Sequence, residues 1–196
     1  MRQRKAALRK ELRDKLAAMT DQQRHAASVA ACALLTATPE WRNARVVMLY
    51  LSMPEQEVDT IALALRAWQE EKTVVVPKVF WDERRILPME ITSLHSVLVT
   101  SDFGVKEPAA GQPIPVNLID LVVVPGLGFS PQGHRIGRGM GFYDRFLSQP
   151  DFVGLSCGLA FEQQVVSGIP MLDHDVPLSM LVTDQGVRRF ATNVIT

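Results

Sequence analysis

The stretch LVVVPGLGFSPQGHRIGRGMGFYDRFL, residues 121–147, decides how the rest of the sequence is interpreted. It begins with four apolar, mostly β-branched residues, a run typical of a strand buried on both faces. Pro125 has no backbone N–H and therefore ends the strand. Because closely spaced glycines follow, we predict a strand, a glycine-rich loop, and a helix that begins near Gly141.

The loop has the composition of a phosphate-binding site. Glycine can adopt positive φ and lets main-chain N–H groups converge on an anion. Guanidinium groups bind phosphate oxygens, and the following helix N-terminus adds partial positive charge. A long structural turn is the alternative, because the loop has neither the Walker A pattern nor the Rossmann fingerprint. The residues concerned are Gly126, Gly128, Gly133, Gly137, Gly139 and Gly141, with Arg135, Arg138 and Arg145.

Asp144, directly after Tyr143, adds a carboxylate to this positive region. One interpretation is a salt bridge to a neighbouring arginine. The other is a ligand for Mg²⁺, since hard cations bind oxygen atoms and often bridge phosphates. We favour the Mg²⁺ interpretation.

The segment GHRIGRGMGFYDR, residues 133–145, resembles the signature of the 5-formyltetrahydrofolate cyclo-ligases, G-x-R-L-G-x-G-x-G-[YF]-Y-D-[RK]. The resemblance spans nearly the whole chain, and one departure is that Ser130 stands where the family usually has Asp. Further matches are K-x-x-x-R at Lys5 and Arg9, the leucine after a strand at Leu51, E-x-x-T at Glu57 and Thr60, G-L-A-F-x-x-Q at residues 158–164, and P-x-x-x-x-D ending at Asp175.

This resemblance implies ATP-dependent conversion of 5-formyltetrahydrofolate to 5,10-methenyltetrahydrofolate, with release of ADP and phosphate, through a phosphorylated formyl (iminium phosphate) intermediate. It implies Mg²⁺ as cofactor, held by Asp144 and Asp175, and catalytic roles for Arg138, Tyr143 and Asp144. The implied ATP-binding residues are Lys5, Arg9, Gly133, His134, Arg135, Ile136, Gly137, Arg138, Gly139, Met140, Gly141, Phe142 and Tyr143. The implied folate-binding residues are Leu51, Glu57, Arg138, Gly139, Met140, Gly141 and Phe142.

Several of these residues also have plainer interpretations. Lys5 and Arg9 lie four residues apart, a spacing that is common on solvated helix faces. Glu57 could be an acid in the first turn of a helix, where the helix dipole favours it. Residues 173–175 could form a surface turn, because neighbouring residues in an extended loop rarely all face one ion. His134 could hydrogen-bond phosphate or simply pack in the loop.

Two other functions fit the same loop. The first is a paralogous enzyme that phosphorylates another acyl or amide substrate, an idea motivated by Ser130 and Pro131. The second is a non-catalytic nucleotide- or folate-binding protein that contacts RNA through the basic residues of its first helix. We favour the cyclo-ligase.

The alternation of apolar segments predicts an α/β fold: a three-layer, Rossmann-like, mostly parallel sheet with helices on both faces. Thr20 and Gln23 form the pattern of a capping box, and Pro39 is expected to stop the helix that follows. The predicted helices cover residues 2–19, 20–38, 58–71 and 162–167; the predicted strands cover 45–52, 73–79, 86–90, 121–124, 152–161, 178–183 and 187–190; a hairpin or excursion is expected at 81–87 and an irregular connection at 103–115.

The length and composition of the chain indicate one domain, residues 1–196, in a reducing compartment. The chain has 21 basic and 21 acidic residues, so its net charge favours neither a nucleic-acid nor a membrane partner. No segment is long and apolar enough to predict a membrane helix. Its two cysteines form no disulfide framework. We therefore expect a cytoplasmic monomer whose partners are small molecules, ATP and a reduced folate.

Overall fold

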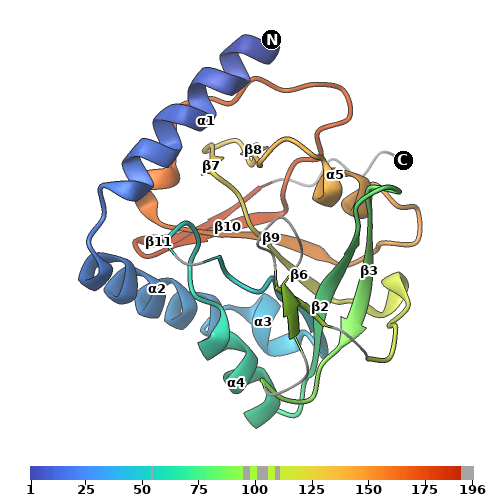
Figure 1. Cartoon of the computed structure of the whole chain (residues 1–196). Coiled ribbons are helices and arrows are strands. Elements are labelled where there is room, and N and C mark those ends of the chain that lie inside the picture. The colour runs from blue at the N-terminus through green and yellow to red at the C-terminus, as the bar shows by residue number, and fades with distance from the viewer. Residues whose placement is uncertain (54, 95–97, 101–105, 109–110, 191–196) are drawn as a thin grey trace.

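A seven-stranded sheet forms the centre of the computed structural model, which describes residues 1–53, 55–94, 98–100, 106–108 and 111–190 (Figure 1). The strand order is β11-β10-β9-β6-β1-β2-β3. The five inner strands are parallel, and the edge strands β3 and β11 are antiparallel to their neighbours. The strands are β1 (Val46–Met48), β2 (Thr73–Phe80), β3 (Arg85–Glu90), β6 (Leu121–Val124), β9 (Leu155–Ala160), β10 (Met180–Thr183) and β11 (Gly186–Arg189).

Helices cover both faces of this sheet, as predicted, but unequally. Alternate strand residues pack on opposite faces: Val47 and Val123 contact the layer of long helices, whereas Met48 and Val122 contact the other layer. That second layer consists of one short helix, α5, with irregular segments around it. The helices are α1 (Arg2–Ala17), α2 (Asp21–Thr36), α3 (Pro39–Asn43) and α4 (Ile61–Gln69) on the first face and α5 (Phe142–Leu147) on the second.

The capping box predicted before α2 is present. Thr20 Oγ1 accepts from the N–H of Gln23, and the Gln23 side chain accepts from the N–H of Thr20. The prediction for Pro39 was incomplete, because α2 already ends at Thr36. Pro39 instead opens α3, where its missing N–H costs nothing, and Thr38 caps that helix through the N–H of Trp41.

The segment between β1 and α4 is less regular than predicted. The strand expected over residues 45–52 ends at Met48, and the helix expected from residue 58 begins at Ile61. Two buried hydroxyls hold this segment instead: Thr60 Oγ1 donates to the carbonyl of Tyr50 at 2.6 Å, and Tyr50 Oη donates to the carbonyl of Val58 at 2.9 Å. These side-chain hydrogen bonds satisfy main-chain carbonyls in a segment that has neither strand pairing nor helical hydrogen bonds.

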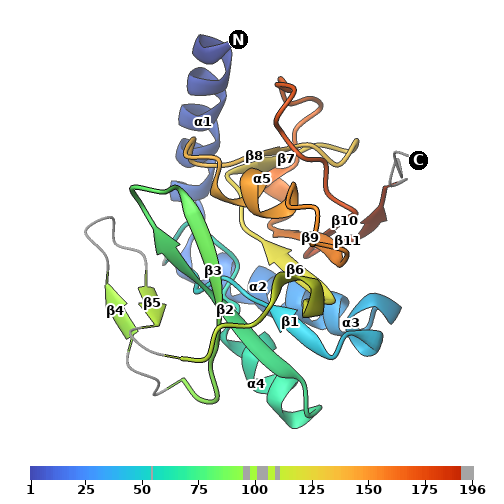
Figure 2. The same ribbon diagram turned by 90° about the vertical axis from the view of Figure 1, so that its right-hand side faces the viewer.

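The hairpin predicted after β2 is confirmed as the β2–β3 pair, with a turn at residues 81–84. Figure 2 shows a small ladder of β4 (Leu98–Thr100) and β5 (Lys106–Pro108) beside this hairpin. The connection predicted over residues 103–115 lies largely outside the described residues. The remaining elements are β7 (Gly128–Phe129), β8 (Arg135–Ile136) and the short 3₁₀ helices η1 (Val116–Leu118) and η2 (Glu162–Gln164).

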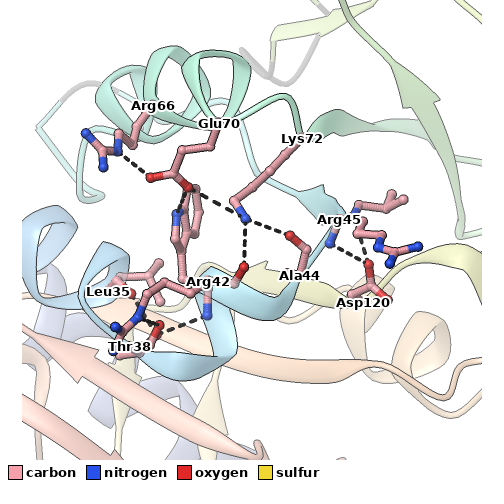
Figure 3. A network of polar contacts seen from close by, with 11 residues as sticks. Leu35, Thr38, Arg42, Ala44, Arg45, Arg66, Glu70, Lys72 and Asp120 are labelled. Carbon is pink, nitrogen blue, oxygen red and sulfur yellow. Dashed lines mark hydrogen bonds and ion pairs between the residues drawn. The ribbon is translucent and has the colours of Figure 1, made fainter.

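A polar network closes the end of the sheet at which the parallel strands begin (Figure 3). The ammonium group of Lys72, just before β2, donates to the carbonyls of Ala44 at 2.7 Å and Arg42 at 3.3 Å. Glu70 accepts from the Trp41 indole at 2.9 Å and lies 3.6 Å from Lys72. Lys72 therefore satisfies carbonyls at the C-terminus of α3, far from the strand ends where α/β proteins bind ligands.

Within the described part of the chain, every helix is too short or too polar to cross a lipid bilayer.

Candidate active site

A cavity of about 790 Å³ lies at the carboxyl ends of the parallel strands. Leu51 follows β1 and Gly126 follows β6, and both line it. This is the edge of a parallel sheet where ligands bind. Fifteen of the predicted site residues line the cavity: Lys5, Arg9, Leu51, Glu57, Arg135, Ile136, Gly137, Arg138, Gly139, Met140, Gly141, Phe142, Tyr143, Asp144 and Asp175.

Gly133 and His134 are the implied ATP-binding residues that do not line this cavity, and Gly128 of the predicted loop does not line it either. Gly133 and His134 lie in the turn between β7 and β8, a two-residue ladder that divides the loop and that we had not predicted. The turn is closed by Ser130, whose N–H donates to the carbonyl of His134 at 2.9 Å. The first two positions of the family signature are thus part of a folded support, and the ligand-facing part of the loop begins at Arg135.

The second part of the loop has the backbone that its glycines permit. Gly139 has φ of 112° and Gly141 has φ of 67°, values that side chains disfavour. Gly141 directly precedes α5, which begins at Phe142 as predicted. This geometry brings the main chain of residues 137–141 to the cavity surface.

Asp144 is held by Arg135. The Arg135 Nη2 atom lies 3.0 Å from the Asp144 Oδ1 atom, and both side chains are largely buried. The N–H of Val176 also approaches that oxygen, at 3.4 Å. The salt bridge, the plainer of our two interpretations, is therefore present, and it holds a carboxylate at the cavity wall.

Asp175 directly precedes Val176 and therefore lies beside this pair. Its carboxylate forms an ion pair with the ammonium group of Lys5 in α1. Its Oδ2 atom also accepts from the N–H of Leu172 at 2.7 Å. Burial by itself would raise the pKa of Asp175, but the hydrogen bonds from Lys5 and Leu172, with the nearby positive charges, hold that pKa below its ordinary value. Asp175 is therefore an ionised carboxylate at neutral pH.

The α1 helix contributes its cations to the cavity rather than to a solvated face. The Lys5 side chain is only 10% exposed. The Arg9 Nε atom donates to the carbonyl of Gly137 at 2.9 Å, which ties α1 to the glycine loop. The long-range contacts of these two residues explain why helix periodicity alone could not distinguish a binding face from a surface face.

Arg138 and Glu57 meet across the cavity. The Arg138 Nη2 atom lies 3.2 Å from Glu57 Oε1, and its Nη1 atom donates to Gln56 Oε1 at 2.9 Å. Glu57 Oε2 accepts from the N–H of Met53 at 2.9 Å. The interpretation of Glu57 as a first-turn acid was wrong, because α4 begins four residues later.

Tyr143 presents a buried hydroxyl at the cavity. Among the described residues, its Oη atom has no hydrogen-bond partner. Burial raises the pKa of Tyr143 above its ordinary value, and Glu57 raises it further, while Arg135 opposes the shift. The hydroxyl therefore stays protonated and can donate to a ligand oxygen.

An apolar wall from β2 and β3 completes the cavity, and sequence reasoning missed it. Pro77, Val79 and Trp81 alternate along one face of β2 and its turn, and Ile86 joins them from β3. Lys78, between Pro77 and Val79 in β2, is not among the cavity residues because neighbouring strand residues point to opposite faces. The period-two alternation of residues along β2 was the feature of the sequence that could have predicted this wall.

Arg145 makes main-chain contacts that we did not predict. Its guanidinium donates to two main-chain carbonyls, those of Met140 and Arg84. The first carbonyl is in the glycine loop and the second is in the turn between β2 and β3. Arg145 therefore joins two walls of the cavity.

The comparison with protein families agrees with this geometry. The model of the 5-formyltetrahydrofolate cyclo-ligase family matches residues 1–184. The chain belongs to this family. Its activity is that of an ATP-dependent 5-formyltetrahydrofolate cyclo-ligase, as the resemblance implied, and the expected family and fold class are confirmed.

Similar cyclo-ligases are known from bacteria and animals. The 5-formyltetrahydrofolate cyclo-ligase of Haemophilus influenzae is 30% identical over 181 residues, 90% of this chain and 95% of the relative. The mouse 5-formyltetrahydrofolate cyclo-ligase is 26% identical over 182 residues, 88% of this chain and 89% of the relative. The NMR structure of Aquifex aeolicus 5,10-methenyltetrahydrofolate synthetase superposes with a TM-score of 0.83 at 31% identity, covering 98% of this chain and 95% of that one.

The departure from the cyclo-ligase pattern at Ser130 has a structural explanation. Ser130 is fully buried, and its Oγ atom lies 3.3 Å from the N–H groups of both Gln132 and His134. Aspartate makes the same kind of bond to main-chain N–H groups in turns. Because Ser130 supports the turn and does not line the cavity, it gives no reason to assign a different substrate.

Proposed function

We propose that this cyclo-ligase transfers the γ-phosphoryl group of ATP to the formyl oxygen of 5-formyltetrahydrofolate, after which N10 closes the ring. The observation that carries this proposal is one cavity with two kinds of wall. Cations from α1 and the glycine loop provide binding for a triphosphate, and the apolar face of β2 and β3 provides binding for a flat heterocycle.

The chemical problem is a poor leaving group. The formyl oxygen would otherwise have to depart as hydroxide. In the proposed first step, the bond from the γ-phosphorus to ADP breaks and a bond from phosphorus to the formyl oxygen forms. N10 then attacks the formyl carbon, the carbon–oxygen bond breaks, and phosphate departs with the proton from N10. The product is the methenyl bridge.

Phosphoryl transfer depends mainly on positioning and on charge neutralisation. Lys5 and Arg9 supply positive charge from α1, and Arg138 supplies it from the glycine loop. The main chain between Gly137 and Gly141 adds N–H groups. Tyr143, which stays protonated, donates to an oxygen of the transferred group. No nucleophilic side chain is required.

Asp144 and Asp175 are the residues that would hold Mg²⁺. Both are carboxylates at the cavity wall, and each already pairs with a cation, Arg135 or Lys5. Two carboxylates suit this ion, which takes its remaining ligands from phosphates and water. When bound, Mg²⁺ neutralises phosphate charge. The chain's own contribution is to hold both carboxylates at the cavity wall.

The test is the absorbance of methenyltetrahydrofolate, followed when purified protein meets 5-formyltetrahydrofolate and Mg-ATP. We expect an ATP-dependent rise that is lost in Asp144→Asn and kept in the matched control Asp173→Asn, because Asp173 is not a cavity residue. Phosphate release is measured in parallel. Folded protein that binds ATP without producing methenyltetrahydrofolate would contradict the proposal.

We also propose that residues 1–196 act as a single-domain monomer in the cytoplasm. Both cysteines, Cys32 and Cys157, are buried free thiols, which supports a reducing compartment. Sedimentation velocity at several protein concentrations tests the monomer, and a concentration-dependent dimer would contradict it.

A further inference from the structure

The Arg145 side chain attaches the turn between β2 and β3 to the glycine loop. Arg145 Nε donates to the Arg84 carbonyl at 3.1 Å, and its Nη2 atom donates to the carbonyl of Met140. A guanidinium suits this role because its donors point in fixed, separate directions. Arg84 has φ of 49°, an unusual value for a residue with a side chain, so the turn is held in a specific shape.

The same attachment brings two aromatic rings together. Trp81 begins the turn, and Phe142 begins α5. Their ring centroids are 5.1 Å apart and their planes meet at 86°, an edge-to-face contact. Both rings are partly buried, and both line the cavity. They therefore form an aromatic corner between the hairpin and the glycine loop.

The charges of the cavity suggest which ligand this corner binds. Lys5 and Arg9 approach from α1, on the side of Asp175 and Gly137. The aromatic corner is continued by Pro77, Val79 and Ile86, which have no charge. A phosphate chain is stabilised by the cations, whereas an uncharged planar ring is stabilised by apolar and aromatic surface.

We propose that Trp81 is a binding residue for the pterin ring of the folate, and that Arg145 is a positioning residue that holds Trp81 against Phe142. Arg145 is then not a phosphate ligand, although it lies in the signature. This inference rests on the proposed function, since it names the part of the substrate that one wall of the cavity recognises.

The first experiment follows the indole N–H signals by NMR with ¹⁵N-labelled full-length protein. The chain has three tryptophans, and within the described residues Trp81 is the one that lines the cavity. Trp81→Phe identifies its signal by loss. We expect 5-formyltetrahydrofolate without ATP to shift that signal, and Mg-ATP without folate to leave it nearly in place. A shift caused by Mg-ATP alone would overturn the assignment of the corner to the pterin ring.

The second experiment separates the two substrates kinetically. Trp81→Leu should raise KM for 5-formyltetrahydrofolate about tenfold, with KM for ATP changed less than about twofold, whereas Trp81→Phe should restore most of the affinity. Arg145→Gln should raise KM for the folate about fivefold and should shift the Trp81 indole signal in the free protein, because the turn is released.

Arg85→Gln is the matched control for Arg145→Gln. Arg85 belongs to the same hairpin, where it pairs with Glu83 and packs on Phe80, and it is not a cavity residue. The Arg85→Gln substitution removes the same charge without detaching the turn. The KM values for the folate and for ATP should therefore stay near those of the unmodified protein. If Arg145→Gln instead raises KM for ATP and leaves the folate KM unchanged, Arg145 is a phosphate ligand and the inference is wrong.

These outcomes are distinct from failure of the proposed function. If unmodified protein forms methenyltetrahydrofolate but the Trp81 signal does not respond to the folate, the proposed function is supported and the role of Trp81 in pterin binding is wrong. If unmodified protein forms no product, the proposed function itself fails.

Discussion

Arg138 and Glu57, which are 81 residues apart in the chain, form an ion pair that joins the glycine loop to the segment after β1. The pair brings a predicted phosphate-binding residue into contact with a predicted folate-binding residue. A ligand that contacted both side chains would therefore lie where the glycine loop meets the segment after β1.

We expect Arg138→Ala to lower kcat/KM by about 10²-fold or more, since removing one donor from transition-state charge typically costs that much. The free energy of unfolding should also fall, by about 1 to 3 kcal/mol, because the Glu57 side chain is only 9% exposed and loses the cation that satisfies its carboxylate. Steady-state kinetics and urea unfolding measure the two effects. A variant that unfolds while its specific activity per folded molecule is unchanged would show that Arg138 is structural.

Glu162 should make the stability depend on pH. Burial would raise its pKa, but Arg188, which binds both carboxylate oxygens, and Thr183 together lower that pKa below its ordinary value. The carboxylate is therefore favoured in the folded state, and its contribution is full above the unfolded pKa of about 4.3 and lost as the pH falls through the lower folded pKa.

The comparison is urea unfolding of the unmodified protein and Glu162→Gln at several pH values. The difference in free energy of unfolding should be constant from about pH 5 to pH 7 and should shrink below about pH 4. A difference that stays the same in acid would mean that the charge of Glu162 does not contribute.

Lys72→Met should destabilise the protein by about 1 to 3 kcal/mol, because it leaves the carbonyls of Arg42 and Ala44 without their donor (Figure 3). Turnover per folded molecule should be unchanged, since this network lies at the opposite end of the strands from the cavity. Urea unfolding and kinetics test both statements. The control is Lys15→Met, which removes an exposed lysine and should have little effect.

Glu71→Gly should stabilise the protein by about 1 kcal/mol. Glu71 follows the end of α4 with φ of 57°, and the N–H groups of Glu71 and Lys72 donate to the carbonyls of Trp68 and Ala67. This is the helix ending that favours glycine, because a side chain is strained there. Glu71→Ala separates loss of charge from relief of strain: if it stabilises equally, the backbone explanation is wrong.

Much of the site could be predicted because its signals are local. The glycines before α5 occupy the conformations for which glycine is suited, and the alternation of strands and helices predicted the parallel sheet. The resemblance to the cyclo-ligases added Lys5 and Asp175, whose neighbours in sequence carry little information about binding.

The amino-acid sequence by itself thus determined the fold class, the glycine loop, the family and most of the cavity residues, since periodicity and short motifs act over a few positions. Only the tertiary structure decided the partners. It directed the Arg145 guanidinium to two main-chain carbonyls, placed Ser130 and His134 in a supporting turn, and brought Trp81 against Phe142. Each of these contacts depends on segments that are distant or differently oriented in the folded chain, so a pattern of neighbouring residues cannot specify them.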